Sequence, residues 1–215
     1  MKKVIAVIGT QTRKLTYHAV QEFEKNLKQK GEIEFEYVFL SDYRLEFCRG
    51  CKVCFDRGEE YCPIKDDRDV LLAKMEQSDG VIFATPNYAF QLSALMKNFL
   101  ERIAFINHRP RFFGKTCTVI VTQGIGFGGD ILKYLCSAGE NLGFHISKGC
   151  CINTLEPMTE VQMKKLEQKV AKTSDRFYRK LTRPRPSPSF FRLMMFRVSR
   201  PLIKSAGEKY RDYPQ

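Results

Sequence analysis

The sequence of 215 residues lacks several features that would place it in common protein classes. No apolar run approaches the roughly 18 residues of a membrane-spanning helix. The apolar run Val4–Ile8 after the basic start is too short for a signal peptide. The three histidines are isolated, and no nucleophile–histidine–acid arrangement or paired-carboxylate site is present. We therefore expect a cytoplasmic protein, and we interpret the histidines as surface or packing residues.

Two nucleotide-binding fingerprints are also missing. The loop after the first apolar run reads Gly9-Thr-Gln-Thr-Arg-Lys-Leu-Thr16, which is neither G-x-G-x-x-G nor a Walker A motif. The loop joins a predicted strand to a predicted helix and is rich in hydroxyl groups. Backbone N–H groups and the helix dipole at such a junction favour a phosphate. The loop therefore indicates either an anion site or an ordinary strand-to-helix turn.

Positive charge is not spread evenly along the chain. The formal net charge is +12, and residues 176–215 alone hold eleven Lys and Arg against two Asp and Glu. The remainder is nearly balanced, so the basic excess belongs to the C-terminal tail. Such a tail can attract anionic partners, but it does not make the whole protein a nucleic-acid binder.

Apolar, β-branched segments alternate with segments of helical periodicity. This alternation predicts an α/β fold with an open parallel sheet covered by helices on both faces. Strands are predicted at residues 3–8, 33–40, 80–85, 115–122 and 144–152. Ligands bind at the carboxyl ends of such strands, where the loops 9–16, 85–91 and 122–129 are expected to meet. Asp66 and Asp67 are interpreted as caps of the helix that follows them.

Four of the eight cysteines form the dense motif C-x2-C-x2-C-x7-C, made of Cys48, Cys51, Cys54 and Cys62. Thiolates at this spacing allow one loop to wrap a [4Fe–4S] cluster, and a proline follows the last cysteine as in ferredoxin-type runs. Redox-active thiols beside a cofactor are the second interpretation. Zinc is the third, although no second C-x2-C knuckle exists. The remaining cysteines are interpreted mainly as small buried hydrophobic residues.

Several motifs in their order along the chain resemble a known family. They are Gly9-Thr10, the cysteine segment with its following Pro-Ile-Lys-Asp-Asp, residues 79–88 and residues 93–102. Together they resemble the flavodoxin-like NADPH-dependent FMN reductases, and the cysteine spacing resembles the iron–sulfur flavoproteins. The resemblance implies a flavodoxin-like sheet of five parallel strands in the order 2-1-3-4-5. It also implies noncovalently bound FMN and a homodimer or homotetramer.

The resemblance also implies roles for individual residues. Those expected to hold the FMN phosphate are Thr10, Thr12, Arg13 and Thr16. Those expected to line the isoalloxazine ring and ribityl chain are Pro86, Asn87 and Tyr88. Those expected to touch the flavin edge are Thr122, Gln123 and Gly124.

The function expected from these features is an FMN-dependent oxidoreductase or electron carrier. NAD(P)H or a ferredoxin-type partner would supply electrons, and a cluster on the four cysteines would pass single electrons to or from FMN. One alternative is a cluster-free NAD(P)H-dependent FMN or quinone reductase with free thiols. Another is a non-enzymatic flavodoxin-like module recruited to a membrane or partner by its basic tail.

The predicted domain, residues 1–181, is followed by a Pro-rich linker and a basic helical extension at residues 182–215. Apolar residues at helical spacing in 190–199 alternate with arginines. The extension is interpreted as docking on the body or on a neighbouring subunit. A second interpretation is binding of residues 189–204 to an anionic membrane surface. Nucleic acid is the least favoured partner.

Overall fold

The computed structural model divides the chain into two units, Met1–Arg183 and Pro184–Gln215. The described residues are 1–107, 109–124, 126, 128–155, 157–183, 194, 197 and 198. Most of the predicted linker and basic extension lies outside them. Among the described residues, no helix is both long and apolar enough to cross a membrane.

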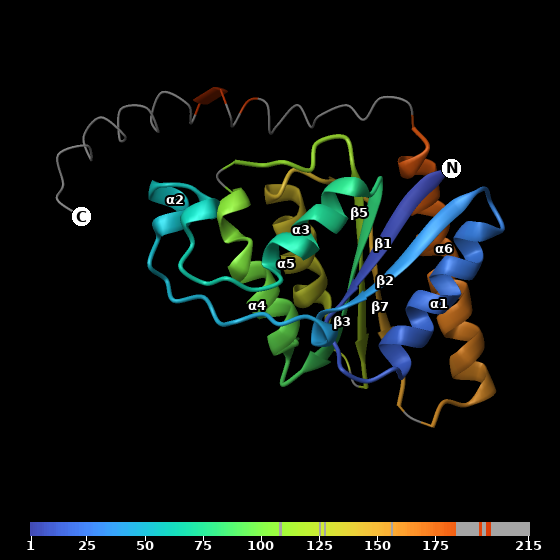
Figure 1. Cartoon of the computed structure of the whole chain (residues 1–215). Helices are drawn as coiled ribbons and strands as arrows, with labels where there is room; N and C mark the ends of the chain where they lie inside the picture. The colour runs from blue at the N-terminus through green and yellow to red at the C-terminus, as the bar shows by residue number, and fades with distance from the viewer. Residues whose placement is uncertain are drawn as a thin grey trace. The chain divides into compact units, whose positions relative to one another are not determined.

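The first unit is built on one predominantly parallel sheet (Figure 1). Its main strands, in spatial order, are β2 (Ile33–Phe39), β1 (Lys2–Ile8), β3 (Gly80–Tyr88) and β5 (Thr116–Gln123). Two short strands, β6 (His145–Ile146) and β7 (Cys150–Asn153), both pair in parallel with β5. The predicted fold class is confirmed, and the spatial order follows the expected 2-1-3-4-5 arrangement when the last two segments are taken as one strand.

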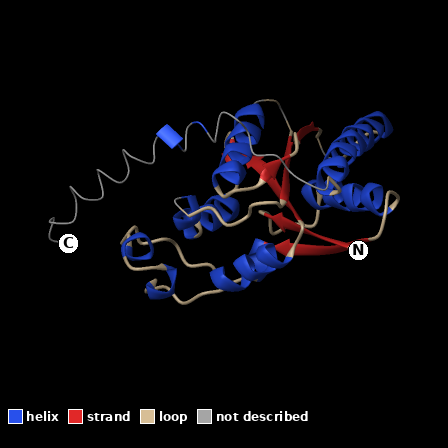
Figure 2. Ribbon diagram, turned by 90° about the horizontal axis from the view of Figure 1, so that it is seen from above, coloured by secondary structure: helices blue, strands red, loops and turns tan. Residues whose placement is uncertain are grey.

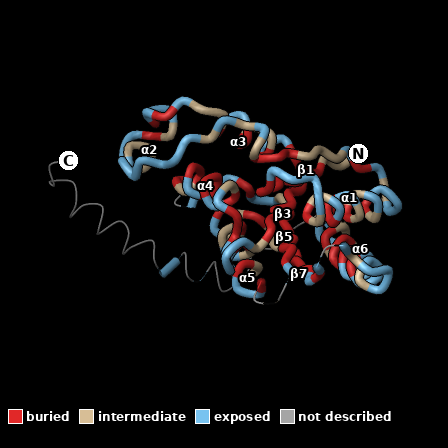
Figure 3. The backbone as a smooth tube through the Cα atoms, turned by 90° about the horizontal axis from the view of Figure 1, so that it is seen from below, coloured by how far each residue is buried: buried red, intermediate tan, exposed pale blue. Residues whose placement is uncertain are grey.

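Alternate residues of the central strands enter two separate cores, because successive side chains of a strand point to opposite faces. Ile5 and Val7 belong to one buried cluster, whereas Val4, Ala6 and Ile8 belong to the other. The sheet therefore buries apolar side chains on both faces, which explains why its strands are continuous apolar runs. Burial is concentrated in the strands β1, β3 and β5 (Figure 3).

Helices cover both faces of the sheet (Figure 2). One face is covered by α1 (Leu15–Lys28) and α6 (Glu160–Leu181), which also contact each other. The other face is covered by α3 (Arg68–Gln77), α4 (Ala94–Arg102) and α5 (Gly128–Asn141). The capping box of Thr159 and Gln162 fixes the start of α6.

The predicted strand 144–152 is wrong as a single element, because a bulge divides it into β6 and β7. His145 lies opposite Thr116, whereas Cys150 lies opposite Ile120, so the edge strand has one more residue than β5 between these pairs. Gly149 occupies the bulge, and a Cβ atom there would collide with the carbonyl oxygen of Val119.

The segment after β3 also differs from the prediction, since it forms a hairpin before the helix. β3 continues to Tyr88 and pairs antiparallel with β4 (Gln91–Leu92). The two turn residues, Ala89 and Phe90, have φ of 48° and 64°, as a tight two-residue hairpin turn requires. Leu92 is therefore a strand residue and not part of the helix as predicted. The helix α4 begins after Ser93, whose hydroxyl accepts a hydrogen bond from the N–H of Met96.

Candidate functional site

The carboxyl ends of β1, β3 and β5 lie at one edge of the sheet, as the sequence predicts (Figure 1). The segments that follow them, residues 9–16, 85–91 and 122–129, are called the strand-end loops below. The N–H of Gly9 donates to the carbonyl of Ala84 at 2.8 Å, which joins the first loop to β3 directly before the second loop. A Cβ atom on Gly9 would lie 2.8 Å from both Ser93 Oγ and Met96 Cβ, so a glycine allows this loop to approach α4 closely.

The first strand-end loop presents an open helix N-terminus. The N-cap residue of α1, Lys14, makes no side-chain cap, and the first turn contains no acidic residue. Thr10 is buried, and its hydroxyl accepts a hydrogen bond from the N–H of Thr12 at 3.2 Å. The first N–H groups of a helix have no partner within the helix, and the helix dipole makes them attractive to an anion. The phosphate group of FMN fits this feature.

Arg13, which the resemblance assigns to the phosphate, is engaged elsewhere in this structure. Its guanidinium lies 3.6 Å from the carboxylate of Asp42 and 4.5 Å from the ring centroid of Phe39. Asp42 belongs to the short 3-10 helix that follows β2 and leads toward the cysteines. Binding of a phosphate by Arg13 would therefore require the ion pair with Asp42 to open.

Buried hydroxyl groups connect the first and third strand-end loops. Thr16, in the first turn of α1, and Thr122, near the end of β5, place their Oγ1 atoms 2.6 Å apart. Both residues are buried. The sequence analysis expected the two loops to lie at one edge of the sheet but assigned these two residues to different parts of the flavin. In the structure they form a buried contact beneath the loops.

A row of side-chain amides crosses the second and third strand-end loops. Asn87 Nδ2 donates to Gln123 Oε1 at 2.9 Å, and Gln123 Nε2 donates to Asn153 Oδ1 at 2.7 Å. The other oxygen of the row, Asn87 Oδ1, is buried without a hydrogen-bond partner among the described residues. A buried acceptor of this kind normally has a donor. The ring N–H of a flavin is such a donor, so FMN fits this feature as well.

Asn153 is a site residue that the sequence analysis missed. It is the last residue of β7, where it lies opposite Gln123 in the parallel register. The expected position of the last strand ended at residue 152, one residue before it. The parallel pairing of the last strand with β5 could have revealed it, because this pairing places the Asn153 amide at the same edge as Gln123.

The remaining predicted flavin contacts lie around this row. Pro86 is buried and opposite Thr122, whereas Tyr88 is 55% exposed on the hairpin. Phe90, at the tip of the same hairpin, is 72% exposed. Gly124 is exposed, and a Cβ atom there would lie 3.0 Å from Leu155 Cδ2. The exposed rings of Tyr88 and Phe90 are thus close in sequence to Asn87 of the amide row.

The four clustered cysteines lie in a different part of the molecule, the cysteine loop of residues 48–62. Cys48 and Cys51 are exposed, Cys54 is half-buried on the short helix α2 (Val53–Asp56), and Cys62 is buried. Among the described residues, no three His, Cys, Asp or Glu side chains come close enough together to hold a metal ion. The predicted metal site is therefore not assembled in this structure. The donor set itself, four free thiols from one loop, suits a cluster.

Both ends of the cysteine loop are held by a buried ion pair. Arg102, in the last turn of α4, donates to Asp66 Oδ1 at 2.8 Å and to Oδ2 at 3.1 Å. Asp66 Oδ2 also accepts from the N–H of Glu46 at 2.9 Å, on the other side of the loop. Both charged side chains are almost completely buried. Asp66 thus anchors the loop.

The neighbouring predicted cap, Asp67, also has another role. It is the N-cap residue of α3 but makes no side-chain cap. Its Oδ2 instead accepts from the N–H of Arg44 at 2.7 Å, and its own N–H donates to the Arg44 carbonyl. The prediction that these aspartates mainly cap the helix is therefore wrong. Among the described residues, the one helix N–H that donates to either carboxylate is that of Arg68, at 3.2 Å from Asp66 Oδ1. Their position before the helix predicted a cap, but the two carboxylates mainly bind residues that are distant in the sequence.

The same anchor acts on Cys62. Arg102 Nη1 lies 3.5 Å from Cys62 Sγ. Burial alone would raise the pKa of Cys62, but the hydrogen bond from the N–H of Ile64 and the nearby Arg102 lower it overall. The pKa of Cys54 is raised by burial and, to a lesser degree, by Cys62. Of these two thiols, Cys62 is thus the one favoured as a thiolate.

The strand-end loops and the cysteine loop meet α4 at opposite ends. The hairpin of the second strand-end loop leads into its first turn, whereas the anchor residue Arg102 is its last residue. The helix has nine residues, which corresponds to about 13 Å. Helix α2 lies beside α4, away from the strands (Figures 1 and 3). One chain therefore presents two separate candidate sites joined by one helix.

The doubly wound parallel sheet, with an open helix N-terminus and an amide row at its carboxyl edge, defines a flavodoxin-like protein. The chain belongs to the NADPH-dependent FMN reductase family, whose sequence profile matches residues 2–149.

Curated relatives carry the name iron-sulfur flavoprotein. One from Archaeoglobus fulgidus is 36% identical over 112 residues, which cover 52% of this chain and 50% of the relative. One from Methanocaldococcus jannaschii is 37% identical over 101 residues, covering 46% of this chain and 51% of the relative. The chain thus spans about half the length of these relatives.

A solved structure confirms the fold. The NAD(P)H:quinone oxidoreductase from Methanothermobacter marburgensis superposes with a TM-score of 0.63, covering 80% of this chain and 95% of that one. The two sequences are 14% identical. The likeness therefore concerns the arrangement of the sheet and helices.

Proposed function

We propose that this chain is an FMN-dependent oxidoreductase that takes reducing equivalents from NAD(P)H and passes them to a small acceptor. The observation that carries the proposal is the convergence of three strand-end loops on an open helix N-terminus and an unpartnered buried acceptor, Asn87 Oδ1. Membership of the FMN reductase family supports it.

The phosphate would bind at the N-terminus of α1. Thr10 and Thr12 offer hydroxyl groups there, and the open N–H groups of the first helical turn favour the anion. Arg13 would add a positive charge after releasing Asp42. Thr16 would keep its contact with Thr122 and hold the first turn of α1 against the end of β5.

The flavin ring would lie along the amide row. FMN supplies hydride and single-electron transfer when bound. Asn87 would accept a hydrogen bond from a ring N–H, and Gln123 would hold the Asn87 side chain in place through the bond at 2.9 Å. Pro86 would form a buried wall, and the exposed ring of Tyr88 would exclude water from one side.

The test is flavin binding followed by turnover. The purified protein should show a flavin absorption spectrum after incubation with FMN and should oxidise NADPH or NADH when a quinone is supplied. Replacing Asn87 by alanine should weaken FMN binding about tenfold, because the amide contacts are lost. The matched control is Asn141→Ala, which removes an exposed amide at the end of α5 and should leave binding unchanged.

Failure to bind FMN would contradict the proposal and favour the alternative of a non-enzymatic flavodoxin-like module. Bound FMN without NAD(P)H oxidation would favour a ferredoxin-type electron donor. A homodimer or homotetramer stays a prediction, and light scattering of the FMN-saturated protein would decide it.

We further propose that Cys48, Cys51, Cys54 and Cys62 hold a [4Fe–4S] cluster. The spacing, the all-thiol donor set and the iron-sulfur flavoprotein name of the relatives support this proposal. Arg102 and the N–H of Ile64, which favour the Cys62 thiolate, also favour metal binding by that sulfur. The loop would need to draw the exposed cysteines inward, since they lie apart in this structure.

Anaerobic purification with iron, sulfide and zinc analysis tests the cluster. Four iron and four sulfide per chain are expected for a [4Fe–4S] cluster, with loss of both in Cys48→Ser. The control Cys136→Ser removes a half-buried thiol outside the loop and should keep the iron. Zinc alone would support the zinc alternative. Absence of all three would leave the cysteines as free thiols.

A further inference from the structure

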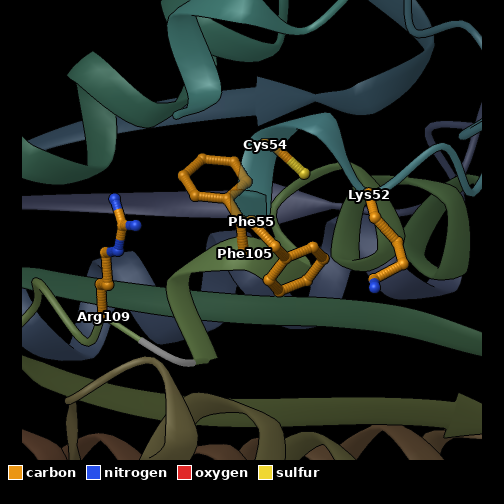
Figure 4. Close-up of a pocket in the computed structure, with 5 residues that line it drawn as sticks. All are labelled: Lys52, Cys54, Phe55, Phe105 and Arg109. Atoms are coloured by element: carbon orange, nitrogen blue, oxygen red, sulfur yellow. The ribbon is translucent and has the colours of Figure 1, made fainter. Parts of the chain in front are cut away.

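A pocket of about 390 Å³ opens beside the cysteine loop. It is lined by Lys52, Cys54, Phe55, Phe105 and Arg109 (Figure 4). Its volume lies near the lower end of the roughly 300–1,000 Å³ typical of ligand sites. The pocket is therefore large enough for a ligand of one or two rings.

Two positive side chains at the pocket have no acidic partner among the described residues. Lys52 and Arg109 are both exposed, and neither takes part in an ion pair or a side-chain hydrogen bond there. They lie on opposite sides of the two phenyl rings in Figure 4. Unpaired cations on two sides of an apolar pocket favour a ligand that carries negative charge.

Other cations near the pocket are already neutralised. Arg111 forms an ion pair with Glu59, and Arg68 forms one with Asp69 at 2.7 Å. Both guanidinium groups also lie over the ring of Phe105, with distances to its centroid of 5.4 Å and 5.2 Å. Asp69 and Glu59 thus pair with Arg68 and Arg111, and neither pairs with Lys52 or Arg109.

The aromatic walls are fixed in place. Phe105 is 3% exposed within the core, and Phe55 packs against the same core from α2. The main-chain N–H of Phe55 donates to the main-chain carbonyl of Lys52 at 2.8 Å, which closes the turn between the two residues. Lys52 has a φ of 59°, a conformation uncommon for a residue with a side chain. This turn thus places Lys52 and Phe55 together in the lining of the pocket.

We propose that this pocket binds a planar aromatic anion, of the class of aromatic carboxylates. Phe55 and the accessible edge of Phe105 would contact the aromatic body of the ligand, while the positive charges of Lys52 and Arg109 would attract its carboxylate. The site lies beside Cys54, away from the strand-end loops. The inference concerns binding to the metal-free protein, because Lys52 and Cys54 belong to the loop that a cluster would rearrange, and it does not depend on bound FMN.

The test is calorimetric titration of the FMN-treated protein with 2-naphthoate and with its neutral analogue 2-naphthamide. Wild-type protein should bind the carboxylate at least tenfold more tightly than the amide. The FMN absorption spectrum should remain unchanged during the titration, and the same affinity should be measured without FMN. Displacement of FMN would place the ligand at the strand-end loops and overturn the proposal.

Substitutions separate the pocket from the general positive charge of the protein. Lys52→Gln and Arg109→Gln should each weaken 2-naphthoate binding by about threefold or more, in line with the value of a partly exposed ion pair. Both should leave 2-naphthamide binding nearly unchanged. The matched control Lys133→Gln removes one exposed charge on α5 and should have no effect. Equal effects of all three substitutions, or no binding by the wild type, would overturn the proposal.

Discussion

The two ends of α4 illustrate two ways in which a fold prepares a site. At its first turn, the strand-end loops are joined by buried contacts, such as that of Thr16 in α1 with Thr122 in β5 and that of Asn87 in β3 with Gln123 in β5. At its last turn, the cysteine loop is anchored near its two ends by Asp66 and Arg102, and Glu59 and Phe55 make further contacts, but Cys48 and Cys51 stay exposed. The first site is therefore formed at the edge of the sheet. The second is an anchored loop whose four thiols are not gathered into a metal site in the described structure.

This difference follows from where the polar groups are buried. The strand-end loops bury hydroxyl and amide groups that must find partners, and their geometry is thereby fixed. The cysteine loop leaves Cys48 and Cys51 exposed, and Gly50, Lys52 and Gly58 have positive φ angles. Because these two thiols are exposed, side-chain packing does not fix their positions relative to the other cysteines. A bound cluster would supply that organisation.

The largest expected effect tests the anchor of the cysteine loop. Asp66→Ala leaves the buried Arg102 charge without its partner, so the free energy of unfolding should fall by about 3–5 kcal/mol. Urea denaturation measures it. The control Glu101→Gln removes an exposed acid from the same helix, where it pairs with Lys97, and should cost about 0.5 kcal/mol or less. Similar losses for both variants would show that the buried pair is not an anchor.

A smaller effect is expected in the strand-end loops. Thr16→Val leaves the buried Thr122 hydroxyl without its partner and should lower the free energy of unfolding by about 1–3 kcal/mol. The double variant with Thr122→Val removes both hydroxyl groups and should recover most of that loss. Additive losses in the double variant would mean that the two hydroxyl groups do not act as a pair.

The pH dependence of stability should separate the two regions further. Burial alone would raise the pKa of Asp66, but Arg102 and the N–H groups of Glu46 and Arg68 lower it overall. The folded protein therefore binds fewer protons than the unfolded chain, so this stabilisation is present above about pH 4 and disappears as the pH falls through the folded pKa. Unfolding midpoints between pH 6 and pH 3 should fall more steeply for wild type than for Asp66→Asn. Parallel curves would argue against this role of Asp66.

The smallest effect on stability is expected for the exposed thiols. Cys48→Ser and Cys51→Ser should change the free energy of unfolding of the metal-free protein by about 0.5 kcal/mol or less, because neither side chain is buried. Thermal denaturation in the presence of a chelator measures this. A large loss in the metal-free variants would show that these thiols already have a structural role.

Much of the fold was predictable because it rests on local pattern. The continuous apolar runs predicted the main parallel strands, and the helical periodicities predicted the helices on both faces. The strand-end loops were correctly expected to meet, since the carboxyl ends of neighbouring parallel strands share one edge. The bulge at Gly149 and the hairpin turn at Ala89 and Phe90 were missed. Both depend on register and on backbone angles that residue type alone does not dictate.

The roles of charged residues were less predictable. Asp66 has the local signature of a helix cap, but its main partner is Arg102, 36 positions further along the chain. Asn153 becomes part of the amide row only through its pairing with Gln123 across the sheet. Such contacts are decided by tertiary packing. By contrast, the cysteine spacing predicted a metal site directly from the sequence, although the thiols do not form one among the described residues.

Hydrogen exchange measured with and without FMN tests the central claim most directly. If FMN binds at the carboxyl edge of the sheet, exchange should slow in peptides covering the strand-end loops 9–16, 85–91 and 122–129. Peptides covering the cysteine loop 48–62 should exchange at an unchanged rate. Protection confined to the cysteine loop, or no protection in any of the three strand-end loops, would contradict this assignment of the flavin site.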